Sequence, residues 1–131
     1  MLAWRKEGSV LDAATVGGDV ASHAQTPTPL LLADRIRVYF AARNAAGTSF
    51  PAYADLDRAD PTRVLAVEPA PVLLPGAPGT FDDEGIMPST IVREGVRILL
   101  YYSGWNRRHS IPYHNSTGLA ESVDGGKSFR R

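Results

Sequence analysis

The segment LLLADRIRVYFAAR, residues 30–43, carries the pattern that decides the fold. Ile36, Val38 and Phe40 occupy alternate positions, and β-branched and aromatic residues are enriched around them. Alternation with a period of two is typical of a strand that buries one face. The dipeptide Ala-Asp at residues 33–34 interrupts the apolar residues and predicts a tight turn. We therefore expect a β-hairpin over this segment.

A second hairpin is predicted by VREGVRILLYYSGW, residues 92–105. Ile98, Leu100 and Tyr102 alternate in the same way, and the dipeptide Glu-Gly at residues 94–95 supplies the turn. No window of the chain shows a convincing helical period beyond about two turns. The chain is therefore expected to be all-β.

The two hairpins belong to a longer internal repeat. RVYFAAR (37–43) aligns with LLYYSGW (99–105) at an offset of 62 residues, and AYADLD (52–57) aligns with LAESVD (119–124) further on. Short strands are also expected at residues 50–56, 64–68 and 117–123. A hairpin followed by two more strands describes a four-stranded blade, and self-similarity on this scale is typical of propellers and solenoids. The predicted fold is a β-propeller fragment of about two four-stranded antiparallel blades in a single partial domain, 1–131, with blades at about 22–70 and 82–131.

The segment SVDGGKSF, residues 122–129, fits the Asp-box pattern S-x-D-x-G-x-[ST]-[FW]. Asp124 is expected to accept hydrogen bonds from backbone amides of the turn. Gly125 and Gly126 permit positive φ angles, and Phe129 is expected to pack below the turn. A box of this kind stabilises the hairpin between outer blade strands in several sugar-active propellers, so its predicted role is structural.

Composition excludes several classes of function. The 14 basic residues balance the 14 acidic residues, so a basic nucleic-acid-binding surface is not expected. The chain contains no cysteine, which excludes disulfides, thiolate catalysis and cysteine-based zinc sites. The first residues, MLAWRKEGSVLD, lack the apolar core of a signal peptide, and no stretch approaches the roughly 18 apolar residues of a membrane span. We expect a cytoplasmic protein with no membrane partner, no metal site and no cofactor.

The order and spacing of several segments resemble the five-bladed β-propeller glycoside hydrolases, which include arabinanases, β-xylosidases, invertases and β-mannoside phosphorylases. The segments are WRKEG (4–8), SHAQTPTPLLLADRIRVYFAAR (22–43), GTFDDEGIMPSTIV (79–92), ILLYYSGW (98–105) and TGLAESVDGGKSF (117–129). The resemblance implies an oligosaccharide or glycan ligand and cleavage of glycosidic bonds by carboxylate acid/base catalysis. A five-bladed propeller needs about five such units and this sequence supplies about two, so we expect the N-terminal two blades, incomplete as given. Their open sheet edges would favour self-association.

The resemblance directs attention to the three carboxylates that precede the predicted inner strand of the second blade. It makes Asp83 the first choice for a funnel carboxylate, acting as acid/base or as a pKa modulator, with Asp82 and Glu84 as further candidates. Hydrolysis needs two such groups on either side of the bond. The alternative is a solvated turn in which an aspartate caps backbone amides.

Other candidates are polar or aromatic. His23 and Gln25 stand where the arabinanase and xylosidase pattern has an aspartate, and they suit hydrogen bonding to sugar hydroxyls. Arg43 and Trp105 occupy matching positions at the ends of the two hairpins, where an indole face suits a pyranose ring and a guanidinium suits hydroxyls or a carboxylate. Core or rim packing is the alternative for Trp105.

The loop NRRHSIPYHNST, residues 106–117, is the longest polar insertion, and with Arg108 and His114 it suits an anionic or phosphorylated ligand. Two other functions remain open on the sequence: a non-catalytic carbohydrate-binding propeller module, and a truncated, inactive fragment.

Overall fold

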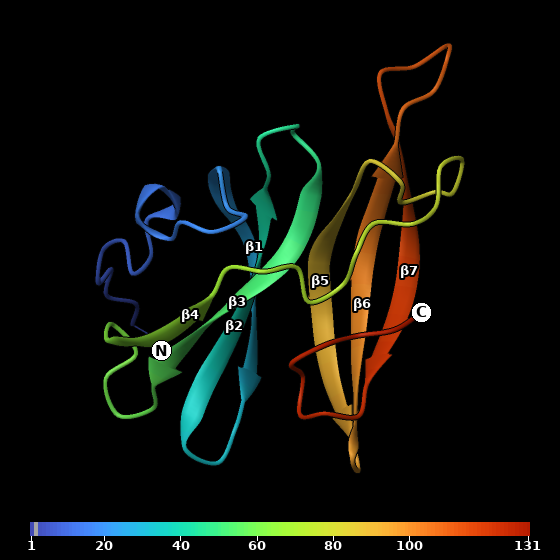
Figure 1. The fold of residues 1–131 in the computed structure, drawn as a ribbon. Coiled ribbons are helices and arrows are strands. Elements are labelled where there is room, and N and C mark those ends of the chain that lie inside the picture. The colour runs from blue at the N-terminus through green and yellow to red at the C-terminus, as the bar shows by residue number, and fades with distance from the viewer. Residues whose placement is uncertain (2) are drawn as a thin grey trace.

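The computed structural model describes residue 1 and residues 3–131. Seven strands follow one short 3₁₀ helix in the described residues (Figure 1). They are η1 (Ala13–Thr15), β1 (Ser22–Leu31), β2 (Arg35–Arg43), β3 (Ser49–Asp57), β4 (Val64–Glu68), β5 (Gly85–Glu94), β6 (Arg97–Asn106) and β7 (His114–Ser122). The predicted all-β class is confirmed. Within this part of the chain no helix has the length and apolarity needed to cross a membrane.

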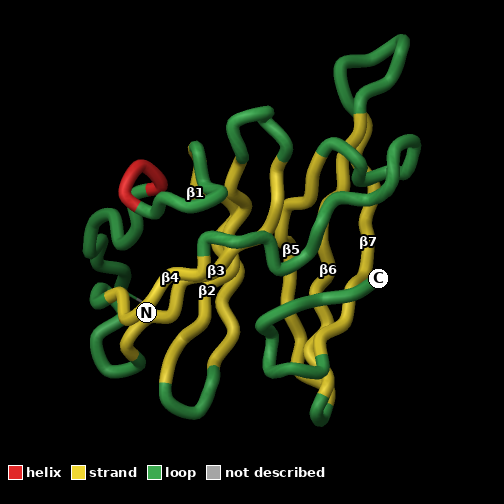
Figure 2. The backbone as a smooth tube through the Cα atoms, viewed as in Figure 1, coloured by secondary structure: helices red, strands yellow, loops and turns green. Residues whose placement is uncertain are grey.

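The strands form two antiparallel units, which we call the first unit (β1–β4) and the second unit (β5–β7). In each unit the strands are paired in chain order. Among the described residues, one parallel pairing, between Ser49 and Gly85, joins β3 to β5. These two strands lie side by side in Figure 2. β1 also packs against β5, so the first strand of each unit lies at the junction between them. This arrangement is consistent with a β-propeller fragment, whereas the division into blades at 22–70 and 82–131 stays a prediction.

Both predicted hairpins are confirmed. β1 pairs with β2 around the turn at residues 32–34, which the hydrogen bond from Leu32 N to Arg35 O closes at 3.0 Å. β5 pairs with β6 around Gly95, whose φ of +61° is costly for a residue with a side chain. The short strand predicted at residues 64–68 coincides with β4.

The boundary of the last strand was predicted wrongly. β7 begins at His114 and pairs with β6 as far as Asn106, so the loop between them spans residues 107–113 instead of 106–117. Polar residues such as His114 and Asn115 have little intrinsic preference for strands. Continuous pairing with β6 overrides that preference.

A hydrophobic core lies between the two units. The first unit contributes Leu30, Tyr39 and Tyr53, and the second contributes Ile86, Ile98, Leu100, Tyr102 and Ala120. Val72 and Leu73, from the segment that crosses from β4 to β5, are buried in the same core. A second core covers the opposite face of the first unit, where Phe40 packs beneath Val20 and its neighbours. Since Tyr39 and Phe40 point to opposite faces of β2, both faces of the first unit are covered.

The 122–129 turn fastens the second unit to the first. Asp124 Oδ1 accepts hydrogen bonds from Lys127 N at 2.9 Å and Ser128 N at 3.1 Å. Gly126, with φ of +80°, presents its carbonyl to Tyr39 Oη, which donates at 2.6 Å. A Cβ atom at position 126 would clash with that hydroxyl, so only glycine fits. Phe129 packs edge-to-face on Tyr39, with ring centroids 5.6 Å apart.

The last residues also bind the crossing segment. Phe129 N donates to Val72 O at 2.8 Å, and the Arg131 guanidinium donates to Leu74 O at 2.7 Å. Arg130 forms an isolated bridge to Glu121 at the free edge of β7. The crossing segment and the last residues, although far apart in the sequence, therefore bind each other beside the core between the two units.

Candidate functional site

The strand register brings the predicted site residues to one end of the two units. Ser22 pairs with Arg43 in the first unit, and Gly85 pairs with Trp105 in the second. The Ser49–Gly85 pairing places these two ends next to each other. The starts of β1, β5 and β7 and the ends of β2 and β6 therefore share one edge of the molecule.

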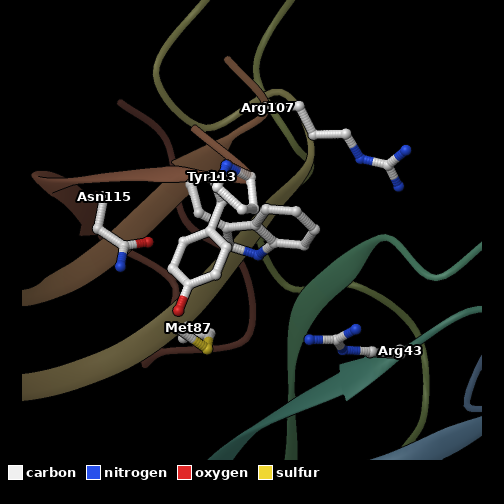
Figure 3. Close-up of a pocket in the computed structure, with 7 residues that line it drawn as sticks. Arg43, Met87, Arg107, Tyr113 and Asn115 are labelled. Carbon is white, nitrogen blue, oxygen red and sulfur yellow. The ribbon is translucent and has the colours of Figure 1, made fainter. Parts of the chain in front are cut away.

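A cavity of about 450 Å³ opens at this end, at the junction of the units (Figure 3). Its lining residues are Arg43 from β2, Met87 from β5, Trp105 from β6, Arg107, Pro112 and Tyr113 from the following loop, and Asn115 from β7. In Figure 3 the guanidinium groups of Arg43 and Arg107 lie on one side, Asn115 lies on the other, and Tyr113 lies between them. The volume falls in the range of roughly 300–1,000 Å³ that is typical of small-ligand sites.

The indole of Trp105 is fixed across the junction. Its Nε1 donates to Ser49 Oγ at 2.7 Å, so a side chain of the second unit bonds to the first. Gly85 makes this approach feasible, because a Cβ atom there would clash with both Ser49 Oγ and Trp105 Nε1. The Arg43 guanidinium carbon lies 5.7 Å from the centroid of the Trp105 ring, within the range of a cation–π contact. The indole lines the cavity in a defined orientation.

The lining carries positive charge. Arg43 and Arg107 are both cationic, and no aspartate or glutamate side chain of the described residues lines the cavity. Arg43 Nε is buried and has no hydrogen-bond partner. The Arg107 side chain is 70% exposed, and its Nε lies 3.6 Å from Glu84 Oε1, a loose contact. The cavity is therefore suited to ligands that accept hydrogen bonds.

The three carboxylates lie in different surroundings. Asp82 is buried, and its Oδ2 accepts hydrogen bonds from Tyr102 Oη at 3.0 Å and Arg131 Nη2 at 2.6 Å. Burial of Tyr102, together with the hydrogen bond to Asp82, raises the pKa of the Tyr102 phenol. Burial opposes the charge of Arg131, but the bond to Asp82 outweighs it and raises the guanidinium pKa. These contacts give Asp82 a role in holding the last residues against β6.

Asp83 and Glu84 lie closer to the surface. Asp83 Oδ2 accepts a hydrogen bond from Gly79 N at 2.6 Å, which is the backbone capping considered as the alternative, while its Oδ1 is buried without a partner. Glu84 reaches the edge of the cavity through Arg107. Its backbone N–H donates to Trp105 O at 3.2 Å, which keeps it beside the indole. A catalytic role for Asp82, Asp83 and Glu84 stays a prediction.

The start of β1 is irregular where His23 and Gln25 were singled out. Register shifts flank Gln25, and His23 and Thr26 have positive φ angles of 67° and 49°. A β-branched residue in this region is strained, and such bulges are common beside binding sites. His23 and Gln25 are exposed at the same end as the cavity, but they do not line it.

The remaining two candidates also lie outside the cavity wall. Arg108 is exposed on the 107–113 loop. His114 begins β7, and its Nδ1 is buried without a partner. Met87 and Asn115, by contrast, line the cavity without having been proposed as site residues. The alternation of Met87 with the buried Ile86 was the signal for Met87, since neighbouring strand residues point to opposite faces.

The sequence of the chain was compared with those of known proteins and families. No family model matches the chain. Two uncharacterized proteins of Mycobacterium tuberculosis, MT1551 of strain CDC 1551 and Rv1502 of strain H37Rv, are each 37% identical to it over 131 residues. Each match covers 99% of this chain and 44% of the relative, so the chain spans less than half the length of these curated relatives.

Two solved structures share the architecture. A glycosyl hydrolase from Bacteroides ovatus matches with a TM-score of 0.64 and 23% identity, over 82% of this chain and 30% of that chain. A glycoside hydrolase-like protein from Parabacteroides distasonis matches with a TM-score of 0.57 and 21% identity, over 82% of this chain and 31% of that chain. At these identities the similarity establishes a glycoside hydrolase-like fold and says nothing of activity.

Proposed function

We propose that this chain supplies a saccharide-binding site to a carbohydrate-active protein of the glycoside hydrolase type. One observation carries the proposal: an indole, two guanidinium groups, a phenol and an amide from both units meet in one cavity. The indole offers apolar area to the C–H groups of a sugar ring. The guanidinium and amide groups offer hydrogen bonds to hydroxyls. The five-bladed propeller and the Asp-box role of the 122–129 turn belong to the same proposal.

Bond cleavage would need two carboxyl groups on either side of the glycosidic bond. Glu84 is the best placed of the three acidic residues, because Arg107 connects it to the edge of the cavity. Asp83 is next, since its Oδ1 has no partner. We propose that these residues act together with acids outside the 131 residues of this chain.

A second candidate is a non-catalytic carbohydrate-binding module. It is favoured by the absence of carboxylates from the cavity wall, among the residues that the structure describes. The same wall would bind a sugar without cutting it. The two candidates share the site and differ in turnover, so they need separate measurements.

Binding is tested by calorimetry of the chain with arabino-, xylo- and manno-oligosaccharides. Trp105→Ala is expected to weaken binding at least roughly tenfold, because stacking on the indole is lost. Trp4→Ala is the matched control: Trp4 is exposed and does not line the cavity, so its removal should leave affinity unchanged. Circular dichroism of both variants checks the fold. Equal effects of the two substitutions, or no binding of any neutral or acidic sugar by the parent chain, would contradict the proposal.

Turnover is tested by following the bound oligosaccharide over hours by chromatography, with and without added phosphate. New reducing ends indicate hydrolysis and a sugar phosphate indicates phosphorolysis. Cleavage by this chain would contradict the non-catalytic module. If the ligand binds and stays intact, the assay is repeated with the longer relative Rv1502, of which this chain covers 44%, and a ligand that stays intact there as well favours the non-catalytic module.

A further inference from the structure

We propose that the ligand of this cavity is an acidic saccharide, with its carboxylate or phosphate group bound between Arg43 and Arg107. The inference rests on the proposed function, since it names the class of sugar that the same site takes. Four features of the structure support it.

The first feature is the local charge. The chain as a whole is neutral, with 14 basic and 14 acidic residues. The cavity wall nevertheless holds two arginines, and the described residues place no aspartate or glutamate side chain in it. The excess of positive charge is therefore a property of this place and not of the protein.

The second feature is the state of Arg43. Two other arginines with buried partners are held by carboxylates: Arg37 of β2 by Asp55 at 2.8 Å, and Arg131, beyond β7, by Asp82 at 2.6 Å. Arg43 has no ion pair among the described residues, and its Nε is buried without an acceptor. A buried donor without a partner costs stability, and a ligand oxygen in the cavity would remove that cost.

The third feature is the loose pairing of Arg107. Its contact with Glu84 is 3.6 Å long, beyond ordinary hydrogen-bond distance, and the side chain is mostly exposed. Arg107 can therefore turn to a ligand anion without breaking a tight contact. Glu84 would then lose its contact with Arg107 and stay at the edge of the cavity without an ion pair.

The fourth feature is the chemistry of the wall. A guanidinium presents a planar fork of donors that matches a carboxylate or a phosphate bidentately. Trp105 lies beside Arg43 and offers a face for the sugar ring. One ring with one acidic substituent can therefore use the indole and the fork at the same time. A neutral sugar would offer the two arginines hydroxyl groups only, and a guanidinium binds these less tightly than it binds a carboxylate or a phosphate.

The test compares matched sugars by calorimetry on the 131-residue chain. Glucose is compared with glucuronate and with glucose 6-phosphate, and acetate and inorganic phosphate serve as anions without a ring. We expect each acidic sugar to bind at least roughly tenfold more tightly than glucose, in line with hydrogen bonds to charged groups. Raising the salt concentration from about 0.05 M to about 0.5 M should reduce that preference, because salt screens exposed charges.

Two variants locate the effect. Arg43→Gln and Arg107→Gln should each remove most of the preference for acidic sugars, and Arg107 is exposed enough for its substitution to leave the fold intact. Arg93→Gln is the matched control, because it removes the same charge from an exposed position at the opposite end of β5. A loss of preference in Arg93→Gln equal to that in Arg107→Gln would overturn the inference.

The outcomes separate the two proposals. Equal affinity for glucose and its acidic counterparts would overturn the inference and leave the saccharide site standing. No binding of any sugar would overturn both. Acetate or phosphate binding as tightly as the matching sugar acid would also overturn the inference, since the ring would then contribute nothing.

Discussion

Tyr39 and Tyr101 occupy matching positions in the two units, yet Tyr39 is fully buried and Tyr101 is 38% exposed. The neighbours on the same face differ in the same way. Leu30 and Tyr53 are buried beneath the second unit, whereas the residues at the same strand register in that unit, Val92 and Leu119, are 44% and 47% exposed. The register matches Tyr53 with Leu119, one residue away from the match that the sequence alignment gives.

The difference in burial shows that the same apolar face is covered in one unit and not in the other. In the first unit, the face that contains Tyr39 is covered by the second unit. The second unit repeats that face, and no described residue of the chain covers it to the same degree. Exposed apolar patches often mark interaction surfaces, so self-association through this side of the molecule stays a prediction.

The largest expected effect is on stability. Tyr39→Ala should lower the free energy of unfolding by about 3–5 kcal/mol, as is typical of a buried aromatic residue. Tyr101→Ala should lower it by less than about 1 kcal/mol, because the ring is partly solvated already. Urea denaturation followed by circular dichroism measures both. Similar losses of unfolding free energy in the two variants would contradict the difference in burial between Tyr39 and Tyr101.

A buried ion pair gives the next test. Arg37 and Asp55 are almost fully buried and pair at 2.8 Å, and Arg37 also lies over the Tyr53 ring. Asp55→Ala should cost about 3 kcal/mol, since it leaves Arg37 buried without its carboxylate. By strand register the matching residue of the second unit is Glu121, which lies opposite Leu99 as Asp55 lies opposite Arg37. The contact of Glu121 with Arg97 is exposed, so Glu121→Ala should cost below about 1 kcal/mol. Urea denaturation measures the loss of unfolding free energy in each variant. Equal losses in Asp55→Ala and Glu121→Ala would contradict the prediction.

Acid should loosen the turn that covers Tyr39. Partial burial works against the charge of Asp124, but hydrogen bonds from Ser122, Ser128 and Lys127 N outweigh it and hold the carboxyl pKa well below its ordinary value. Because the pKa is lowered by folding, the stability it provides is complete above roughly pH 4 and is lost as the pH falls toward the folded pKa. Asp124→Asn should therefore flatten the loss of stability between about pH 4 and pH 2. An unchanged acid profile in thermal unfolding would show that the turn contributes little.

The smallest effect on folding is expected on the exposed face itself. Leu119→Lys should change the free energy of unfolding by less than about 0.5 kcal/mol, as is usual for surface positions. If the face associates, the same substitution should reduce the concentration-dependent increase in mass seen by analytical ultracentrifugation. Arg93→Lys serves as a control on the same unit. Association that persists in Leu119→Lys would place the contact elsewhere.

The sequence predicted what depends on local pattern. The hairpins over residues 30–43 and 92–105 follow from alternation and from short turns, both of which are visible in a few neighbouring residues. The start of β7 was missed because His114 and Asn115 are polar, and only the pairing with β6 makes them a strand.

The surroundings of the candidate site depend on contacts between distant residues. The sequence alone gives no partner for the Asp82 carboxylate, but Arg131, 49 positions away, donates a hydrogen bond to it. The bond from Trp105 to Ser49 spans 56 positions and is permitted by the missing side chain of Gly85. Alternation with the buried Ile86 indicates the face of β5 on which Met87 lies, but only the pairing of β5 with its neighbours brings that face to the cavity. No local pattern carries that information.

The hydrogen bond from Tyr39 to Gly126 spans 87 residues, and this has a consequence for synthesis in the cell. At roughly 5–20 residues per second, a ribosome needs about 4–17 s to make the residues between them. During that time the nascent first unit emerges with its aromatic face uncovered. A chaperone that holds hydrophobic strands would find its substrate in this interval, and slow codons placed before residue 122 would lengthen the exposure.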